Sequence, residues 1–241
     1  MEGEAKGLMA IWADVDPEAQ FEFEKWHNCE HMADRVTIPG FLLGFRYQGI
    51  GATPYSLMAY ETVDPSVLES EPYLRSKNNP TPWTRELLTR FRHTERLIYR
   101  LAASLGQKPV TQAPYLYSLR FDTEGEEGAK AAEWLREGVL ARIAAVPEIS
   151  RARLYRVDEK ASSIVTAEQK IYGDGPALKR RFLILAEMGS ASWPEDEIWR
   201  DLCGQEKAVS VQGRLAIPAI PAIKNDCEGC YWLRFVMQAP G

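Results

Sequence analysis

Residues 26–35 concentrate side chains that can move protons or bind anions. The segment reads WHNCEHMADR and holds two of the three histidines of the chain. In a helix, His27, His31 and Arg35 follow one another at intervals of four residues and therefore share one face. A neutral imidazole can take a proton from a phenol, an enol or an activated C–H group, and a second imidazole can return it. A guanidinium beside them can bind a carboxylate or an enolate. The spacing therefore predicts acid–base chemistry.

The same residues allow two other interpretations. Residues 27–31 match the pattern H-x-x-E-H, and two histidines four residues apart on a helix can share a metal ion. A zinc hydrolase of this kind needs a third ligand and a helix-rich framework, and no paired downstream motif is visible. Another metal held by His27, His31 and a strand carboxylate or tyrosine stays open. So does a structural cluster in which Glu30 hydrogen-bonds the imidazoles and fixes the packing.

An internal repeat indicates which elements position these residues. At an offset of 108 residues, two stretches align without a gap from about residue 7 to about residue 48 of the first copy. We therefore divide the chain into repeat 1 (residues 1–105) and repeat 2 (residues 106–241), with residues 106–112 as the linker. The residues shared by the two copies include Trp26 and Trp134, Pro39 and Pro147, Tyr47 and Tyr155, Asp14 and Asp122, and Leu8 and Leu116.

Each repeat reads as strand, helix, strand, strand, helix, strand, which is the ferredoxin-like unit. Such a unit carries its helices on one face of an antiparallel sheet, so two copies can pack their bare faces together. We predict an α+β fold in which tandem ferredoxin-like repeats close an α/β barrel. The expected strands are 7–13, 41–48, 55–63 and 96–102 in repeat 1, and 115–121, 149–157, 182–187 and 231–237 in repeat 2. The expected helices are 16–36 and 64–91, interrupted near residue 79, then 128–145 and 195–203.

Repeat 2 also contains two insertions, at 158–177 and 204–229. The second one includes an apolar stretch with two prolines, at 215–223. Proline prevents a regular helix or a central strand there. We expect this stretch to lie over a hydrophobic opening.

The two repeats differ where chemistry is expected. The helix of repeat 2 carries aliphatic residues where repeat 1 carries its imidazoles and guanidinium, the aligned pairs being His27 and Leu135, His31 and Val139, and Arg35 and Ile143. An aliphatic stripe at this spacing must cover its sheet. Repeat 1 therefore presents polar groups to its own sheet, and we predict a polar pocket there, with repeat 2 as a degenerate partner. The candidate site comprises His31 as principal acid or base, His27 as its partner, Glu30 to orient an imidazole, Arg35 to bind an anion, and Trp26, Tyr47 and Tyr60 as further substrate-binding residues.

A family resemblance rests on Trp26-His27-Asn28-x-Glu30-His31-x-x-x-Arg35, Pro39-Gly40-Phe41 and Arg46-Tyr47. These residues resemble the dimeric α/β-barrel superfamily in its EthD-like branch, with both halves fused in one chain. The resemblance is specific over residues 7–103 and rests on the repeat for residues 113–238. It implies the barrel fold. That superfamily includes cofactor-free monooxygenases, lactone isomerases, polyketide cyclases and haem enzymes, so the resemblance leaves the reaction open.

We expect an enzyme without a cofactor that isomerises, cleaves, cyclises or oxygenates a small aromatic, polyketide-like or other carbonyl-bearing compound. A non-catalytic protein that binds the same class of ligand is the alternative. A haem enzyme is a further alternative, although the chlorite dismutase-like pattern has its haem ligand in the second copy. Residues 113–238 contain no histidine, which disfavours haem.

Composition sets the broad class. Apolar residues make up 45% and charged residues 26%, which is typical of a globular protein and excludes disordered, collagen-like and disulfide-dense classes. A net charge of -5 disfavours nucleic acid and anionic membranes as partners, and no apolar run approaches the roughly 20 residues of a membrane helix. Without an export signal at the N-terminus, we expect a cytoplasmic protein with reduced cysteines, compatible with a homodimer. Cys227 and Cys230 form a C-x-x-C without a second pair, which predicts a chance pair in a loop.

Overall fold

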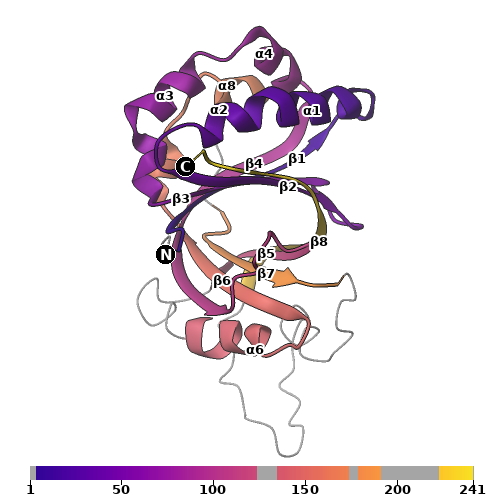
Figure 1. Ribbon diagram of the computed structural model, residues 1–241, viewed down its shortest axis with the longest axis vertical. Helices are drawn as coiled ribbons and strands as arrows, with labels where there is room; N and C mark the ends of the chain where they lie inside the picture. Colours follow the sequence, from indigo (N-terminus) through magenta and orange to yellow (C-terminus); the bar gives the residue numbers. More distant parts are fainter. Residues whose placement is uncertain (1–3, 124–134, 174–178, 191–222, 241) are drawn as a thin grey trace, which may run out of the picture.

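A closed barrel of antiparallel strands forms the centre of the molecule (Figure 1). The computed structural model describes residues 4–123, 135–173, 179–190 and 223–240. Around the barrel, the strands follow the order β1-β3-β2-β8-β5-β7-β6-β4. Figure 1 shows α1 to α4 and α8 on one side of the barrel and α6 on the opposite side. The predicted α+β class, with two ferredoxin-like repeats closing a barrel, is confirmed.

The two repeats have the same strand order, β4-β1-β3-β2 in the first and β8-β5-β7-β6 in the second. The strands of repeat 1 are β1 (Gly7–Val15), β2 (Phe41–Gly49), β3 (Ser56–Thr62) and β4 (Phe91–Gly106). Its helical segments are η1 (Pro17–Ala19), α1 (Gln20–Trp26), η2 (His27–His31), α2 (Met32–Val36), η3 (Pro65–Glu69), α3 (Glu71–Asn78) and α4 (Pro82–Leu88). The strands of repeat 2 are β5 (Tyr115–Thr123), β6 (Ile149–Val157), β7 (Phe182–Met188) and β8 (Ile223–Gln238). Its helical segments are η4 (Leu135–Leu140), α6 (Ala141–Ala144), α7 (Glu159–Ser163) and α8 (Gln169–Tyr172). The predicted helix over 195–203 and the proline-containing stretch up to residue 222 lie outside the described residues.

Alternate residues of each strand point into the barrel or toward the helices, because successive side chains of a strand project to opposite faces. The interior is lined mainly by apolar and aromatic side chains, among them Trp12, Tyr47, Tyr99 and Tyr155. A buried ionic group joins the two repeats inside the barrel. Arg153 of β6 pairs with Glu61 of β3 and with Glu187 of β7. The two glutamates occupy equivalent positions, since Glu61 pairs in register with Leu8 and Glu187 with Leu116.

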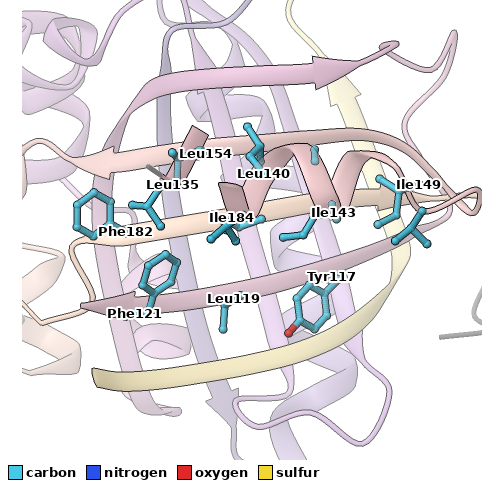
Figure 2. Packing of buried hydrophobic residues seen from close by; sticks show 14 of the residues in the cluster. Tyr117, Leu119, Phe121, Leu135, Leu140, Ile143, Ile149, Leu154, Phe182 and Ile184 are labelled. Carbon is cyan, nitrogen blue, oxygen red and sulfur yellow. The ribbon is translucent and has the colours of Figure 1, made fainter. Parts of the chain in front are cut away.

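Figure 2 shows apolar side chains of the repeat 2 helix packed over its sheet. Leu135, Leu140 and Ile143 lie over residues of β5, β6 and β7 such as Leu119, Leu154 and Ile184, and the cluster includes Val139. All of these side chains are buried. The stripe predicted to face the repeat 2 sheet is therefore confirmed for Leu135, Val139 and Ile143.

Truncating this stripe is expected to destabilise the protein. Leu135→Ala should lower the free energy of unfolding by about 2–5 kcal/mol, because the side chain is fully buried and its removal leaves a cavity. Denaturant unfolding measures the change. Glu137→Ala, an exposed change on the same helical turn, should alter the free energy by less than about 0.5 kcal/mol. Equal losses for the two variants would show that this helix is not part of the core.

The described part of the insertion at 158–177, residues 158–173, lies over repeat 1, although it belongs to repeat 2 in sequence. α7 is attached to β4, where the Ser162 hydroxyl accepts a hydrogen bond from the Ile98 amide and donates one to the Ile98 carbonyl. Farther along, the Glu168 amide donates to the Lys77 carbonyl of α3. The Tyr172 ring of α8 stacks on Phe91 with a centroid distance of 6.2 Å. Repeat 1 is therefore covered by its own helices and by a segment from its twin.

One sequence expectation about the cysteines was wrong. Cys227 and Cys230 both fall within β8 rather than in a loop before it, because β8 begins earlier than predicted. Cys230 is a free, half-buried thiol. The membrane-span criterion of length and apolar composition is met by no helix of the described residues.

Candidate functional site

The predicted site residues lie on one helical run made of α1, η2 and α2. Its central turn, η2, is a π-helix, a rare form that often marks functional sites. The equivalent turn of repeat 2, η4, is also a π-helix and carries only aliphatic residues toward its sheet. The π-turn therefore belongs to the shared fold rather than to the chemistry of repeat 1. What distinguishes η2 is its imidazoles, since His27 and His31 are buried with ring centroids 5.9 Å apart.

His27 is the deeper of the two histidines and contacts the sheet. Its side chain is fully buried, and Nε2 lies 3.2 Å from the hydroxyl oxygen of Tyr60 on β3. The ring also lies against Phe23, with centroids 5.7 Å apart. Its other ring nitrogen, Nδ1, is buried and has no hydrogen-bond partner among the described residues. The structure therefore brings Tyr60 and His27 together as a hydrogen-bonded pair.

His31 lies closer to solvent and is held by an aromatic contact. Its side chain is 8% exposed, and its ring lies 4.3 Å from the Trp26 ring, centroid to centroid. Its Nδ1 atom is buried and has no partner in the described part of the chain. The Trp26 indole is itself fixed, because its Nε1 donates to the Thr84 hydroxyl of α4 at 3.1 Å. His31 thus combines a fixed ring with an uncommitted nitrogen.

Burial and nearby cations make both imidazoles weak bases. Burial lowers the pKa of His27 well below its usual 6.5, and the positive charges of Arg46 and Arg35 lower it further. The pKa of His31 is lowered in the same way by burial, Arg35, Lys77 and His27. Both rings are therefore neutral at neutral pH, which is the form that accepts a proton.

These lowered pKa values predict a loss of stability on the acid side. Between pH 6.5 and the lower pKa of the folded protein, the unfolded chain binds protons that the folded chain does not. The free energy of unfolding must therefore fall as the pH falls, by at most about 1.4 kcal/mol per pH unit for each histidine. Replacing His27 with Leu and His31 with Val should make this fall shallower in unfolding experiments between pH 7.5 and 5. Replacing the exposed His93 with Gln serves as the control, and an unchanged slope in the double variant would contradict the burial of neutral imidazoles.

Arg35 does not stand free for a ligand anion, contrary to the sequence expectation. Its guanidinium forms a buried ion pair with Glu168 from the insertion of repeat 2, and it donates to the Ser76 hydroxyl at 2.5 Å. Lys77 of α3 binds the same carboxylate. Burial raises the pKa of Glu168, but Lys77 and Arg35 lower it more, so the net shift is downward and the carboxylate stays charged. Arg35 therefore lies near the imidazoles, but its positive charge is already compensated by Glu168.

Two further expectations need correction. Glu30 does not orient an imidazole, because its carboxylate accepts hydrogen bonds from the hydroxyls of Thr81 and Thr84. It therefore connects η2 to the start of α4. Tyr47 points into the barrel, where its hydroxyl donates to the Ala113 carbonyl and accepts from Gln112. It lies on the face of the sheet opposite to the histidines, because the neighbouring residue of β2, Arg46, takes the helix-facing position.

Several residues of this region were not found from the sequence. Tyr73 of α3 and Arg96 of β4 are buried and hydrogen-bonded to each other, with Nη2 of Arg96 donating to the Tyr73 hydroxyl at 3.1 Å. Arg46 of β2 lies against the Phe23 ring. Arg46 and Arg96 lie within predicted strands of the barrel, and a charged residue in such a strand is a signal that could have identified them. No such signal marked Glu168, because it lies in an insertion and the sequence does not specify against which part of the fold that insertion packs.

The contrast between the repeats extends from the helix to the sheet. Repeat 1 presents polar side chains on the strands below its helix, whereas repeat 2 presents mostly apolar ones. In strand register, Tyr60 pairs with Met9. Ala186 pairs with Tyr117, which is the repeat 2 equivalent of Met9, so Ala186 is the equivalent of Tyr60. The equivalents in the two repeats are Arg46 and Leu154, Tyr60 and Ala186, and Arg96 and Glu228. In the repeat 1 site, both the helix and the sheet below it therefore carry polar residues where repeat 2 carries mostly apolar ones. The described residues include no group of three or more His, Cys, Asp and Glu side chains placed to share a metal ion.

Solved structures share this architecture over nearly the whole chain. An anthrone oxidase-like protein superposes with a TM-score of 0.64 and 13% identity, covering 100% of this chain and 95% of its own. A candidate monooxygenase from Fusobacterium nucleatum superposes with a TM-score of 0.54 and 7% identity, covering 99% and 97%. One from Lactobacillus acidophilus superposes with a TM-score of 0.52 and 6% identity, covering 98% and 97%.

At these identities the likeness establishes a shared fold. That fold is the closed barrel of antiparallel strands described above. No protein-family model matches the chain, and no curated protein sequence matches it.

Proposed function

We propose that the protein is an acid–base enzyme that acts on a small aromatic ketone or phenol at the repeat 1 site. The observation that carries the proposal is the pair of buried, neutral imidazoles on the helix face that repeat 2 fills with aliphatic side chains. A fold that packs well with leucine and valine has no structural need for two histidines there. Neutral imidazoles with uncommitted Nδ1 atoms are suited to receive and return a proton.

His31 is the principal acid–base group in this proposal. It is the more exposed imidazole, and its ring is held against Trp26. In the reaction, an imidazole nitrogen takes the proton as the C–H bond next to a carbonyl breaks, and the electron pair moves into an enolate. The resulting imidazolium then returns a proton to carbon or oxygen. His27 and the Tyr60 hydroxyl, which are joined by a hydrogen bond, stabilise the oxyanion or relay the proton.

The names of the structural neighbours support this class of substrate. One of them is called anthrone oxidase-like, and an anthrone is an aromatic ketone with an acidic C–H group. The EthD-like pattern of residues 26–35 is compatible with this chemistry. We propose that these proton transfers need no bound cofactor. A Soret band in the absorbance spectrum of the purified protein would contradict this, and so would stoichiometric zinc in a metal analysis.

Hydrogen–deuterium exchange at carbon tests the proposal directly. Aromatic ketones with an acidic C–H group, anthrone among them, are incubated with the protein in D2O and followed by NMR. We expect exchange at that carbon to be accelerated on the order of 100-fold or more over buffer, because proton transfer precedes any later isomerisation, cyclisation or oxygenation. Ligand binding without any accelerated exchange would instead support the alternative of a non-catalytic binding protein.

A further inference from the structure

Arg96 is a buried cation whose hydrogen bonding is incomplete. Its side chain lies on β4, facing the helices, and is 2% exposed. Nη2 donates to the Tyr73 hydroxyl, which is a phenol rather than a carboxylate. Its Nε and Nη1 atoms are buried and have no hydrogen-bond partner among the described residues. Burying a guanidinium is unfavourable unless its donors are satisfied, so these atoms call for an acceptor.

The surroundings of Arg96 carry excess positive charge. Arg35 and Lys77 converge on Glu168 in the same region, which leaves three buried cations with one buried carboxylate among the residues that the structure describes. These positive charges affect the pKa of the Tyr73 phenol. Burial raises its pKa, but Arg96, Lys77 and Arg35 lower it more, so that the pKa is below its usual 10. Asp34 and Glu30 are more exposed and lie at the rim of this region. An anion brought into the site would therefore be stabilised by charge as well as by hydrogen bonds.

Tyr73 connects Arg96 to the imidazole side of the site. Its hydroxyl donates to the sulfur of Met9 on β1, and Met9 pairs in register with Tyr60. Both tyrosine rings lie against Phe41, at centroid distances of 5.9 Å for Tyr73 and 6.1 Å for Tyr60. A continuous row thus runs from the His27–Tyr60 pair to Arg96 across β3, β1 and β4.

We propose that Arg96 and Tyr73 form an anion-binding subsite, and that the natural ligand is an aromatic compound with a carboxylate or phenolate group. This inference rests on the proposed function, because it assigns the two ends of one ligand to the two ends of the row. The imidazoles act on the reacting carbon, while the guanidinium binds the oxygen anion and fixes the position of the ring. The subsite thus binds the anion of the ligand, which is the role that the sequence suggested for Arg35.

Binding of a matched pair of probes tests the subsite. The probes are 2-hydroxybenzoate and 2-hydroxybenzamide, which have similar shapes but differ in charge at pH 6.5, where the carboxyl group is ionised and both phenols are neutral, and binding is measured by calorimetry. We expect the wild-type protein to bind the carboxylate at least tenfold more tightly than the amide. Arg96→Gln should remove this preference, whereas Arg96→Lys should keep part of it because it keeps the charge. If Arg96→Gln does not fold, Tyr73→Phe carries the test, and it should weaken the preference by removing one hydroxyl.

The control is Arg100→Gln, the same change at an exposed position of β4, which should leave the preference unchanged. A wild-type protein that binds both probes equally, or neither, would overturn the subsite. So would a preference that survives Arg96→Gln. The His27→Leu and His31→Val double variant should keep the anion preference while losing carbon exchange, so a failure of the subsite is distinguishable from a failure of the proposed enzyme activity.

Discussion

Replacing both His27 with Leu and His31 with Val is expected to abolish proton transfer while leaving the protein folded. The loss in the rate of carbon exchange should be on the order of 100- to 10,000-fold, the range typical for removal of a general acid–base group. The fold should tolerate the change, because repeat 2 already packs Leu135 and Val139 against its sheet at the equivalent positions.

The structure adds one refinement to this experiment. The Tyr60 hydroxyl is buried, and its hydrogen bond to Nε2 of His27 would be lost in the double variant. An unsatisfied buried hydroxyl costs about 1–3 kcal/mol, so the double variant should be less stable by up to this amount at neutral pH. Adding Tyr60→Phe removes the orphaned group and should recover most of the loss. Thermal unfolding and carbon exchange are therefore measured for the double and the triple variant together.

A matched control lies on the same helical turn. Cys29 is exposed and lies on η2 between the two histidines, so Cys29→Ser should change neither exchange nor stability. Normal exchange in the double variant would exclude the imidazoles as the acid–base groups. Unfolding of both the double and the triple variant would instead assign His27 and His31 a structural role.

Replacing Glu168 with Gln is expected to produce one of the largest losses of stability in the protein. Its carboxylate is buried and is the shared partner of Arg35 and Lys77. Removing its charge leaves two buried cations uncompensated, which typically costs about 3–5 kcal/mol. The melting temperature should fall by about 2–4 °C for each kcal/mol in a chain of this size. Urea denaturation and thermal unfolding measure the effect.

The same segment offers a control of identical chemistry. Glu159 lies on α7 and is exposed, so Glu159→Gln should change the free energy of unfolding by less than about 0.5 kcal/mol. Adding Lys77→Met to Glu168→Gln removes one of the stranded charges and should recover part of the stability. A Glu168→Gln variant as stable as the Glu159→Gln variant would show that the insertion does not hold the repeat 1 site together. A fragment ending at residue 105 would lack Glu168, so we expect the site to need both repeats.

Much of the fold could be predicted from the sequence because its signals are local or periodic. The repeat is visible as an offset of 108 residues, and each copy contains the alternation of strand and helix that defines the ferredoxin-like unit. The face of the first helix followed from the same reasoning. Residues at intervals of four share a helix face, and the aliphatic stripe of repeat 2 identified which face meets the sheet. His27 and His31 were placed correctly for this reason.

The direction of the strand residues could not be predicted, and Tyr47 illustrates why. Hydrophobic alternation distinguishes the two faces of a strand only when one face is solvated. The β2 and β3 strands are covered on both faces, by the barrel interior and by the helices, and β3 is buried throughout. Tyr47 and Tyr60 were therefore equally plausible from the sequence, and only the pleat of the folded sheet separated them.

The fold class, the repeat and the helix face that carries the imidazoles could all be predicted from local patterns in the chain. The partners of those residues became visible only in the folded molecule. Arg35 and Glu168 are 133 residues apart, and they meet because the β4–β6 pairing that closes the barrel brings the insertion after β6 onto repeat 1. Spacing along a chain specifies the face of one element, whereas contacts between elements depend on how the whole chain closes. For that reason the compensated Arg35 and the incompletely bonded Arg96 became distinguishable only in three dimensions.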